Sequence, residues 1–205
     1  MINEDFVLKT YNDYFFYDSR TRLRYQSIEA ARILFEYFND IESVIDLGCG
    51  VCSFIEGMLL NKNIKEVKGI EIAYENAKKY ISKNVLEYVE QGDVSLPIKD
   101  EYANKYDCAF SIEVAEHILP ENSDIFVDNL CKCAKKLIIL TTARPDQGGV
   151  EHINCREKSF WIEKIENRGW ILAKQDLENV IALLDKNEWI EWYMKDNLSI
   201  YKKST

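Results

Sequence analysis

The sequence lacks long apolar runs, internal repeats and low-complexity tracts. No apolar stretch approaches the roughly 18 residues that a membrane-spanning helix needs, so we expect no membrane association. The opening stretch, MINEDFVLK, has acidic residues where a secretory leader would have basic residues followed by an apolar segment. We therefore expect a cytoplasmic protein in which the six cysteines are reduced thiols.

The chain also lacks an excess of basic residues. Its formal net charge is -9, which disfavours nonspecific binding to nucleic-acid phosphates, so we expect no nucleic-acid partner. Hydrophobic residues make up 47% and charged residues 30%, as in an ordinary globular protein. These features favour a small-molecule partner and leave the oligomeric state open.

Strand-like and helix-like segments alternate along the chain. A length of 205 residues suits one domain, here 1–205, with a core over 41–205 and an N-terminal helical addition or lid over 1–40. The alternation predicts an α/β fold with a mostly parallel sheet that has helices on both faces. Strands are expected at 43–48, 66–72, 84–94, 105–113, 136–143, 170–177 and 197–203. Helices are expected at 27–40, 53–62, 73–83, 122–135 and 156–169, with another before the last strand.

The stretch SVIDLGCGVCSF, at 43–54, contains a glycine turn between the first strand and its helix. Such a turn lets backbone approach a ligand, although it can also be a tight turn that binds nothing. Glu71 ends the next strand 21 residues after Gly50, where nucleotide-binding sheets place an acid for a ribose. Ser53 occupies the last position of the dinucleotide fingerprint, and no phosphate-loop lysine follows. A ligand with a ribose but no pyrophosphate fits this pattern better than NAD or ATP.

Four successive motifs, VIDLGCGVCSF, VKGIEI, EQGDV and YDCAFSIEVAEHI, resemble those of class I S-adenosylmethionine-dependent methyltransferases over residues 43–118. The resemblance implies a Rossmann-like fold, with a seven-stranded sheet whose last strand is antiparallel and S-adenosyl-L-methionine across the strand ends. The implied cofactor-binding residues are Asp46, Gly48, Cys49, Gly50, Glu71, Ile72, Asp93, Val94, Ile112 and Glu113.

The resemblance also implies what these residues do. Gly48 and Gly50 would line the methionine portion, Asp46 would support their loop, and Cys49 would contribute backbone. Glu71 would hold the ribose hydroxyls. The adenine would lie beside Ile72, Asp93 and Val94, and the segment 112–114 would form the floor near the sulfonium.

A looser resemblance covers residues 148–170, which are similar to a segment of methyltransferases that accompany glycan and nucleotide-sugar biosynthesis. Together the two resemblances imply a small-molecule methyltransferase that methylates a sugar hydroxyl or a phosphate-type oxygen, in a polysaccharide context. N-methylation and a catalytically silent cofactor-binding subunit remain alternatives.

The two histidines are the candidate catalytic residues. His152 follows two glycines in the loop after the fifth strand, where an acceptor would enter, and is a candidate base. His117 closes the fourth motif and is the second candidate. The spacing of the Cys, His, Asp and Glu residues gives no convincing ligand cluster, so no metal is expected. Arg22, with two neighbouring arginines, is either a solvated residue or part of a lid that pairs with the cofactor carboxylate.

Overall fold

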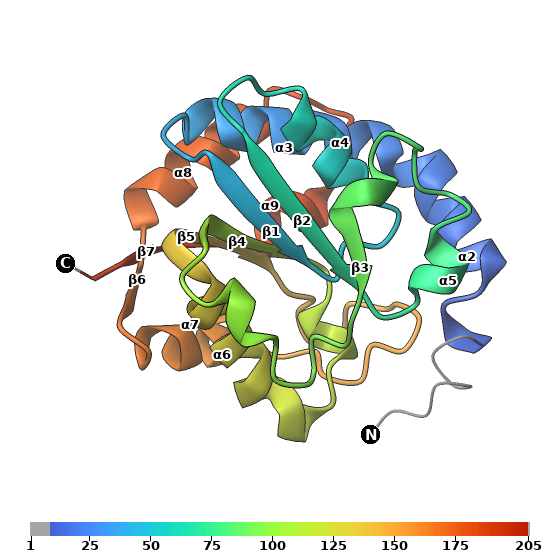
Figure 1. The fold of residues 1–205 in the computed structure, drawn as a ribbon. Helices are drawn as coiled ribbons and strands as arrows, with labels where there is room; N and C mark the ends of the chain where they lie inside the picture. Colours follow the sequence, from blue (N-terminus) through green and yellow to red (C-terminus); the bar gives the residue numbers. More distant parts are fainter. Residues whose placement is uncertain (1–8, 205) are drawn as a thin grey trace.

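A computed structural model describes residues 9–204 and contains a seven-stranded sheet in the order β3-β2-β1-β4-β5-β7-β6 (Figure 1). Strands β1 to β5 are parallel, whereas β7 is antiparallel to both β5 and β6. The expected sheet, including its antiparallel last strand, is confirmed. The strands are β1 (Ser43–Leu47), β2 (Glu66–Glu71), β3 (Val89–Gln91), β4 (Tyr106–Ile112), β5 (Ala134–Thr141), β6 (Trp170–Leu172) and β7 (Leu198–Lys203).

Helices cover both faces of the sheet (Figure 1). Helices α3, α4 and α8 contribute to one apolar cluster, and α6 and α7 contribute to a second cluster on the opposite face. Because both faces are covered, the central strands are buried almost throughout, as expected for a parallel sheet. The helices are α2 (Asp13–Asp18), α3 (Arg24–Tyr37), α4 (Ser53–Leu59), α5 (Tyr74–Ala77), α6 (Ser123–Cys133), α7 (Lys158–Glu166), α8 (Lys174–Leu184) and α9 (Trp192–Asp196).

Three segments are shorter than the sequence patterns predict. The strand expected at 170–177 ends at Leu172, because Leu177, Val180, Ile181 and Leu184 have helical spacing and pack inward from α8. The strand expected at 84–94 is reduced to the edge strand β3, preceded by a single 3₁₀ turn at Leu86–Tyr88. The helix expected at 73–83 is regular only over α5, and turns follow it.

The N-terminal segment is helical over its described part, and residues 1–8 lie outside it. Helix α2 leads through a π-helical turn, Ser19–Leu23, into α3. Helix α3 buries Ala30, Ala31, Leu34 and Phe35 in the core, so this part of the expected addition belongs to the layer that covers the sheet.

Glu56 of α4 fastens the N-terminal segment to the core. Its buried carboxylate accepts hydrogen bonds from Arg20 Nη1 at 2.6 Å and Arg24 Nε at 2.8 Å, and also from Ser82 Oγ. Burial raises the pKa of Glu56, but the Ser82 and Arg20 hydrogen bonds outweigh burial and hold it below its ordinary value of 4.5. The ionised carboxylate therefore fixes the two arginines in place.

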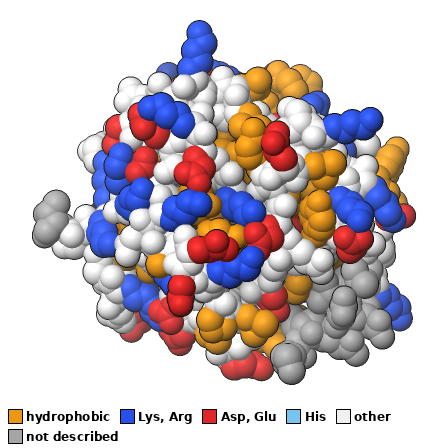
Figure 2. All heavy atoms as spheres, in the orientation of Figure 1, with side chains coloured by type: hydrophobic (Ala, Val, Ile, Leu, Met, Phe, Trp, Pro, Cys, Tyr) orange, Lys and Arg blue, Asp and Glu red, His pale blue; other side chains and the backbone are white. Residues whose placement is uncertain are grey.

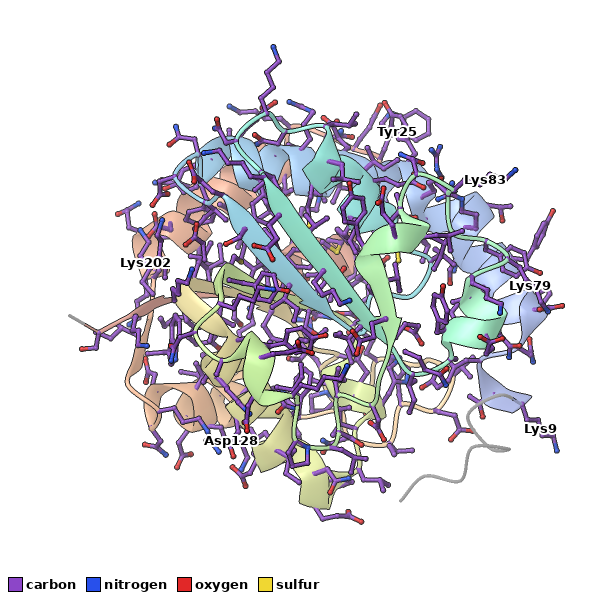
Figure 3. The ribbon with its side chains drawn as sticks, viewed as in Figure 1. Lys9, Tyr25, Lys79, Lys83, Asp128 and Lys202 are labelled. Carbon is purple, nitrogen blue, oxygen red and sulfur yellow. The ribbon has the colours of Figure 1, made fainter. Side chains whose placement is uncertain are left out.

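The surface carries both signs of charge. Figure 2 shows lysines and arginines interspersed with acidic residues over one face, with small apolar patches between them. Lys79, Lys83 and Tyr25 project outward from the helical side, and Lys202 lies at the edge where β7 ends (Figure 3). Within residues 9–204, no helix is both long and apolar enough to cross a membrane.

Replacing Glu56 with alanine should lower the free energy of unfolding by about 1–3 kcal/mol, because Arg20, whose side chain is only 19% exposed, loses its partner. Glu75→Ala, which removes an exposed pair with Lys78, is the matched control and should cost about 0.5 kcal/mol or less. Chemical denaturation measures both. Since the pKa of Glu56 is lower in the folded state, its contribution exists above pH 4.5 and should fade as the pH falls through the folded pKa. Equal losses in the two variants, independent of pH, would contradict the assignment.

Candidate active site

A cavity of about 260 Å³ opens at the carboxyl ends of the parallel strands, where open α/β sheets bind their ligands. Residues from the loops that follow β1, β2, β3, β4 and β5 line it, together with residues of the N-terminal segment. Every cofactor-binding residue expected from the sequence lies on this cavity except Arg22. The expected residues that line it are Asp46, Gly48, Cys49, Gly50, Glu71, Ile72, Asp93, Val94, Ile112 and Glu113.

The glycine turn after β1 is shaped by its neighbours. The amides of Gly48 and Cys49 donate to Ile70 O at 2.9 and 3.0 Å, which ties the turn to β2. Gly48 has a φ of +86°, and a Cβ there would lie 2.5 Å from Val114 Cγ2, so only glycine fits. Gly50 has a φ of +53° and would direct a Cβ into open space. Gly48 is therefore required by packing, whereas Gly50 keeps the cavity open.

Two buried acids lie under the turn. Glu71 Oε2 accepts from Gly50 N at 2.9 Å, and its Oε1 accepts from Ala73 N at 2.8 Å. Asp46 is 2% exposed, and its Oδ2 has no hydrogen-bond partner among the described residues. Burial raises the pKa of both carboxyls, and the negative charge of Glu71 raises that of Asp46 further. Each acid lines the cavity and has lone pairs to offer a ligand's donors.

Apolar side chains line the cavity beside the ends of β2, β3 and β4, namely Ile72, Val94 and Ile112. Asn129 of α6 fixes the loop after β3 by donating to Val94 O at 2.9 Å and to Leu96 O at 2.8 Å. Asp93 turns the same loop, because its Oδ1 accepts from Ser95 N at 2.8 Å. This part of the cavity therefore offers apolar surface next to a polar side chain.

The N-terminal segment closes the cavity with aromatic rings. Tyr11, Phe15 and Phe16 line the cavity, and Tyr11 lies edge-on to His117 with ring centroids 5.9 Å apart. Tyr11 was not among the residues expected from the sequence to line the cavity, although the aromatic residues Tyr14, Phe15, Phe16 and Tyr17 that follow it were a visible signal. Arg22, by contrast, has a side chain that is 66% exposed, pairs with Asp18 at 3.2 Å and does not line the cavity.

The two histidines lie against each other at one corner of the cavity, where His117 lines the cavity and His152 lies behind it. Their rings meet edge-on with centroids 4.9 Å apart, and His152 Nε2 lies 3.9 Å from Glu116 Oε1. Burial and the neighbouring imidazole of His152 lower the pKa of His117 to about 4, so His117 is neutral at physiological pH. Burial, and then the charge of Glu113, raise the pKa of Glu116 well above its ordinary value. Sequence spacing did not connect these residues, and the structure groups Glu116, His117 and His152.

The cysteines of the glycine turn are free thiols. Cys49 Sγ and Cys52 Sγ are 3.4 Å apart, both side chains are buried, and burial raises the pKa of Cys49 well above its ordinary value. Cys52 has a φ of +61°, a conformation that glycine adopts more readily. The pair therefore packs as small core residues.

The fold and the cavity define a Rossmann-like protein that binds a nucleoside-type ligand at its strand ends. The family model for the methyltransferase domain matches residues 17–199, so the chain belongs to this methyltransferase family. No curated protein matches the sequence.

Solved structures show the same fold. The chain is similar to a SAM-dependent methyltransferase from Archaeoglobus fulgidus, with 17% identity, a TM-score of 0.62, and coverage of 93% of this chain and 99% of that one. It is also similar to magnesium protoporphyrin IX methyltransferase from Synechocystis PCC 6803 with bound SAH, at 15% identity, TM-score 0.59, and 91% and 86% coverage. An O-methyltransferase of a Brevibacillus brevis polyketide synthase, in complex with S-adenosyl-L-homocysteine, shares 21% identity, with TM-score 0.55 and 84% and 71% coverage.

Replacing Glu71 with alanine should weaken binding of S-adenosylhomocysteine by about ten- to a hundred-fold, because a charged acceptor of a hydroxyl hydrogen bond contributes roughly 1.5–3 kcal/mol. Isothermal titration calorimetry measures the affinity. Glu66→Ala removes an exposed acid at the opposite end of β2 and should leave affinity unchanged. Equal affinities in the two folded variants would remove Glu71 from the site.

Replacing Gly50 with alanine separates binding from folding. The left-handed backbone should cost about 1–2 kcal/mol of stability, because an L-residue is strained there. The new methyl group would project into the cavity and should lower the affinity for S-adenosylhomocysteine by at least ten-fold. Thermal unfolding and calorimetry test the two effects separately. Unchanged affinity in a folded Gly50→Ala variant would show that the ligand does not approach this turn.

Proposed function

We propose that the protein is an S-adenosyl-L-methionine-dependent methyltransferase that acts on an oxygen of a small-molecule acceptor. The observation that supports this most strongly is the joining of Glu71, Asp46 and the open face of Gly50 on one cavity in a chain of the methyltransferase family. When bound, the cofactor supplies a sulfonium-activated methyl group, so the acceptor oxygen gains the methyl, the sulfur keeps the electron pair of the broken bond, and the hydroxyl proton leaves.

The residues present fit this cofactor. Glu71 would accept from the ribose hydroxyls, since each of its oxygens already holds one amide and has a lone pair to spare. Asp46 Oδ2, buried without a partner, would accept from the amino group of the methionine portion. Ile72 and Val94 would enclose the adenine, and Asp93 would lie at its edge.

The acceptor side of the cavity is the corner with His117. At this corner the protein would exclude water and orient the acceptor oxygen. It would also accept the proton of the acceptor hydroxyl or lower the pKa of that hydroxyl. His117, Glu113 and Glu151 line the cavity at this corner, and Ile153 adds apolar surface. The acidic side chains disfavour a phosphate-type oxygen, so a neutral hydroxyl, such as that of a sugar, is the acceptor class we propose.

An amine is the second candidate acceptor. Glu113 and Glu151 would attract a cationic amine before it loses its proton, which favours N-methylation over methylation of an anion. A catalytically silent subunit would bind the cofactor and transfer nothing.

A transfer assay tests the proposal. The protein is incubated with S-adenosylmethionine labelled in the methyl group and with a panel of sugars, nucleotide sugars, phenols and amines, and labelled products are separated. Transfer to a hydroxyl compound is expected. Transfer to amines alone would select the second candidate, and cofactor binding without transfer to any compound would favour the silent subunit.

Replacing His152 with alanine should lower turnover by roughly a hundred-fold or more, because this side chain serves the acceptor. The affinity of this variant for S-adenosylhomocysteine should be unchanged, since His152 is not among the residues that line the cavity. Glu157→Ala, an exposed change nearby in the chain, is the control and should match the wild type. Wild-type turnover in the His152 variant would assign this histidine to structure alone.

A further inference from the structure

Three groups capable of ligating a metal meet at the histidine corner. Glu116, His117 and His152 each offer a ligand atom, and these atoms lie within 4.8 Å of one another. Backbone bonds assemble the group, because Ile153 N and Asn154 N both donate to Glu116 O, at 3.0 and 2.9 Å. The loop that contains His152 is thereby fastened directly to the short turn that contains Glu116 and His117.

A backbone carbonyl orients each of the two imidazoles. His117 Nδ1 lies 3.2 Å from Glu151 O, and His152 Nδ1 lies 3.1 Å from Gln147 O. A carbonyl only accepts, so each Nδ1 is the protonated nitrogen and each Nε2 keeps a lone pair. An imidazole whose second nitrogen donates to a backbone carbonyl is the usual arrangement of a metal-ligating histidine.

The carboxylate of Glu116 lacks a partner. The residue is 0% exposed, and neither Oε1 nor Oε2 has a hydrogen-bond partner among the described residues. Within residues 9–204, no lysine or arginine forms an ion pair with it or with neighbouring Glu113. Glu113 receives only neutral amide donors, from Gln147 at 2.7 Å and Asn197 at 3.0 Å. Burial without hydrogen bonds or a counter-charge disfavours the ionised form of Glu116, and a cation at this corner would favour it.

Gly149 packs directly against the imidazole of His152. A Cβ built on Gly149 would lie 2.1 Å from His152 Nε2 and 2.4 Å from Cδ2 and Cε1, so a larger residue at this position would displace the ring. The ligand atoms of a metal with bonds of about 2.1 Å lie roughly 3.4 Å apart across a tetrahedron, so the observed 3.9 Å between His152 Nε2 and Glu116 Oε1 needs only a small contraction.

From these contacts we infer that Glu116, His117 and His152 form a site for a divalent transition-metal cation at the acceptor end of the cavity. Two imidazoles and one carboxylate suit Zn²⁺ or Mn²⁺, and three protein ligands leave a coordination position open. This proposal replaces the expectation from the sequence that no metal is present. The spacing along the chain did not suggest the site, because folding brings His152 to Glu116 and His117.

The cation deepens the proposed function and rests on it for its role. His117 borders the cavity, so the open position of the cation would face the acceptor. There it would bind the acceptor hydroxyl and lower its pKa, which promotes loss of the proton. His152 would then act as a ligand of the cation and not as the base that the sequence analysis expected.

Metal binding is tested directly, without turnover. Chelator-treated protein is titrated with Mn²⁺, and the free ion is followed by electron paramagnetic resonance, with Zn²⁺ competition as a second measurement. We expect one Mn²⁺ per chain, displaced by Zn²⁺. The variants Glu116→Gln, His117→Ala and His152→Ala should each weaken binding by at least ten-fold. Glu121→Gln, an exposed acid four residues beyond His117, should bind as the wild type does.

The outcomes separate the site from the enzyme activity. Absence of Mn²⁺ and Zn²⁺ binding at millimolar concentration, or equal binding by the wild type and all three ligand variants, would overturn the metal site. A thermal-unfolding temperature that rises with Zn²⁺ in the wild type but not in folded Glu116→Gln would support it.

If the metal binds here while the transfer assay is negative, the site stands and the proposed function falls. If labelled methyl is transferred by metal-free protein, the function stands and the catalytic role of the cation falls.

Discussion

The carboxylate of Glu71 lies where two loops must meet for the cavity to exist. One oxygen holds the amide of Gly50, in the turn after β1, and the other holds the amide of Ala73, in the turn after β2. Because strands β1 and β2 pair in parallel up to this point, both turns emerge at the same edge of the sheet. The buried carboxylate of Glu71 fixes the spacing of the two loops and still has lone pairs for a ligand. In our proposal the same group therefore organises the site and accepts hydrogen bonds from the ribose hydroxyls.

The other end of the cavity depends on a different set of contacts. The loop after β5 folds back so that Ile153 N and Asn154 N reach Glu116 O, and Asn154 Nδ2 donates to Ser123 Oγ at 3.0 Å. This docking brings His152 against His117. The two ends then differ in chemistry. Amide donors satisfy Glu71 at the cofactor end, whereas Glu116 at the acceptor end has no donors and lies beside two imidazoles, which is why we place a cation there.

The sequence predicts which residues line the cavity at the strand ends, because these residues follow the ends of successive strands. Asp46, Gly48, Gly50 and Glu71 are recognisable from local spacing, and the topology of a parallel sheet brings strand ends together. The role of the arginines was not predictable in the same way. Arg20 and Arg24 are four residues apart on one helical face and meet Glu56, so Arg22 between them points to solvent.

Contacts made by loops were beyond the sequence patterns. In the sequence Glu116 is simply a polar residue of a short turn. Its burial without a hydrogen-bond partner becomes apparent only when the loop after β5 lies against this turn. Tyr11 lies just before α2 and reaches the cavity where α2 packs near α5, a contact that neither segment signals in its own sequence. Short elements such as α5 and β3 were overestimated, because apolar spacing persists beyond the last regular hydrogen bond.

A crystal structure of the protein with S-adenosylhomocysteine tests the central claim most directly. The account predicts ligand density in the cavity at the strand ends. The ribose hydroxyls should lie within hydrogen-bond distance of Glu71, the adenine between Ile72 and Val94, and the sulfur should face the corner of His117. Density at another place, or a ribose remote from Glu71, would contradict it.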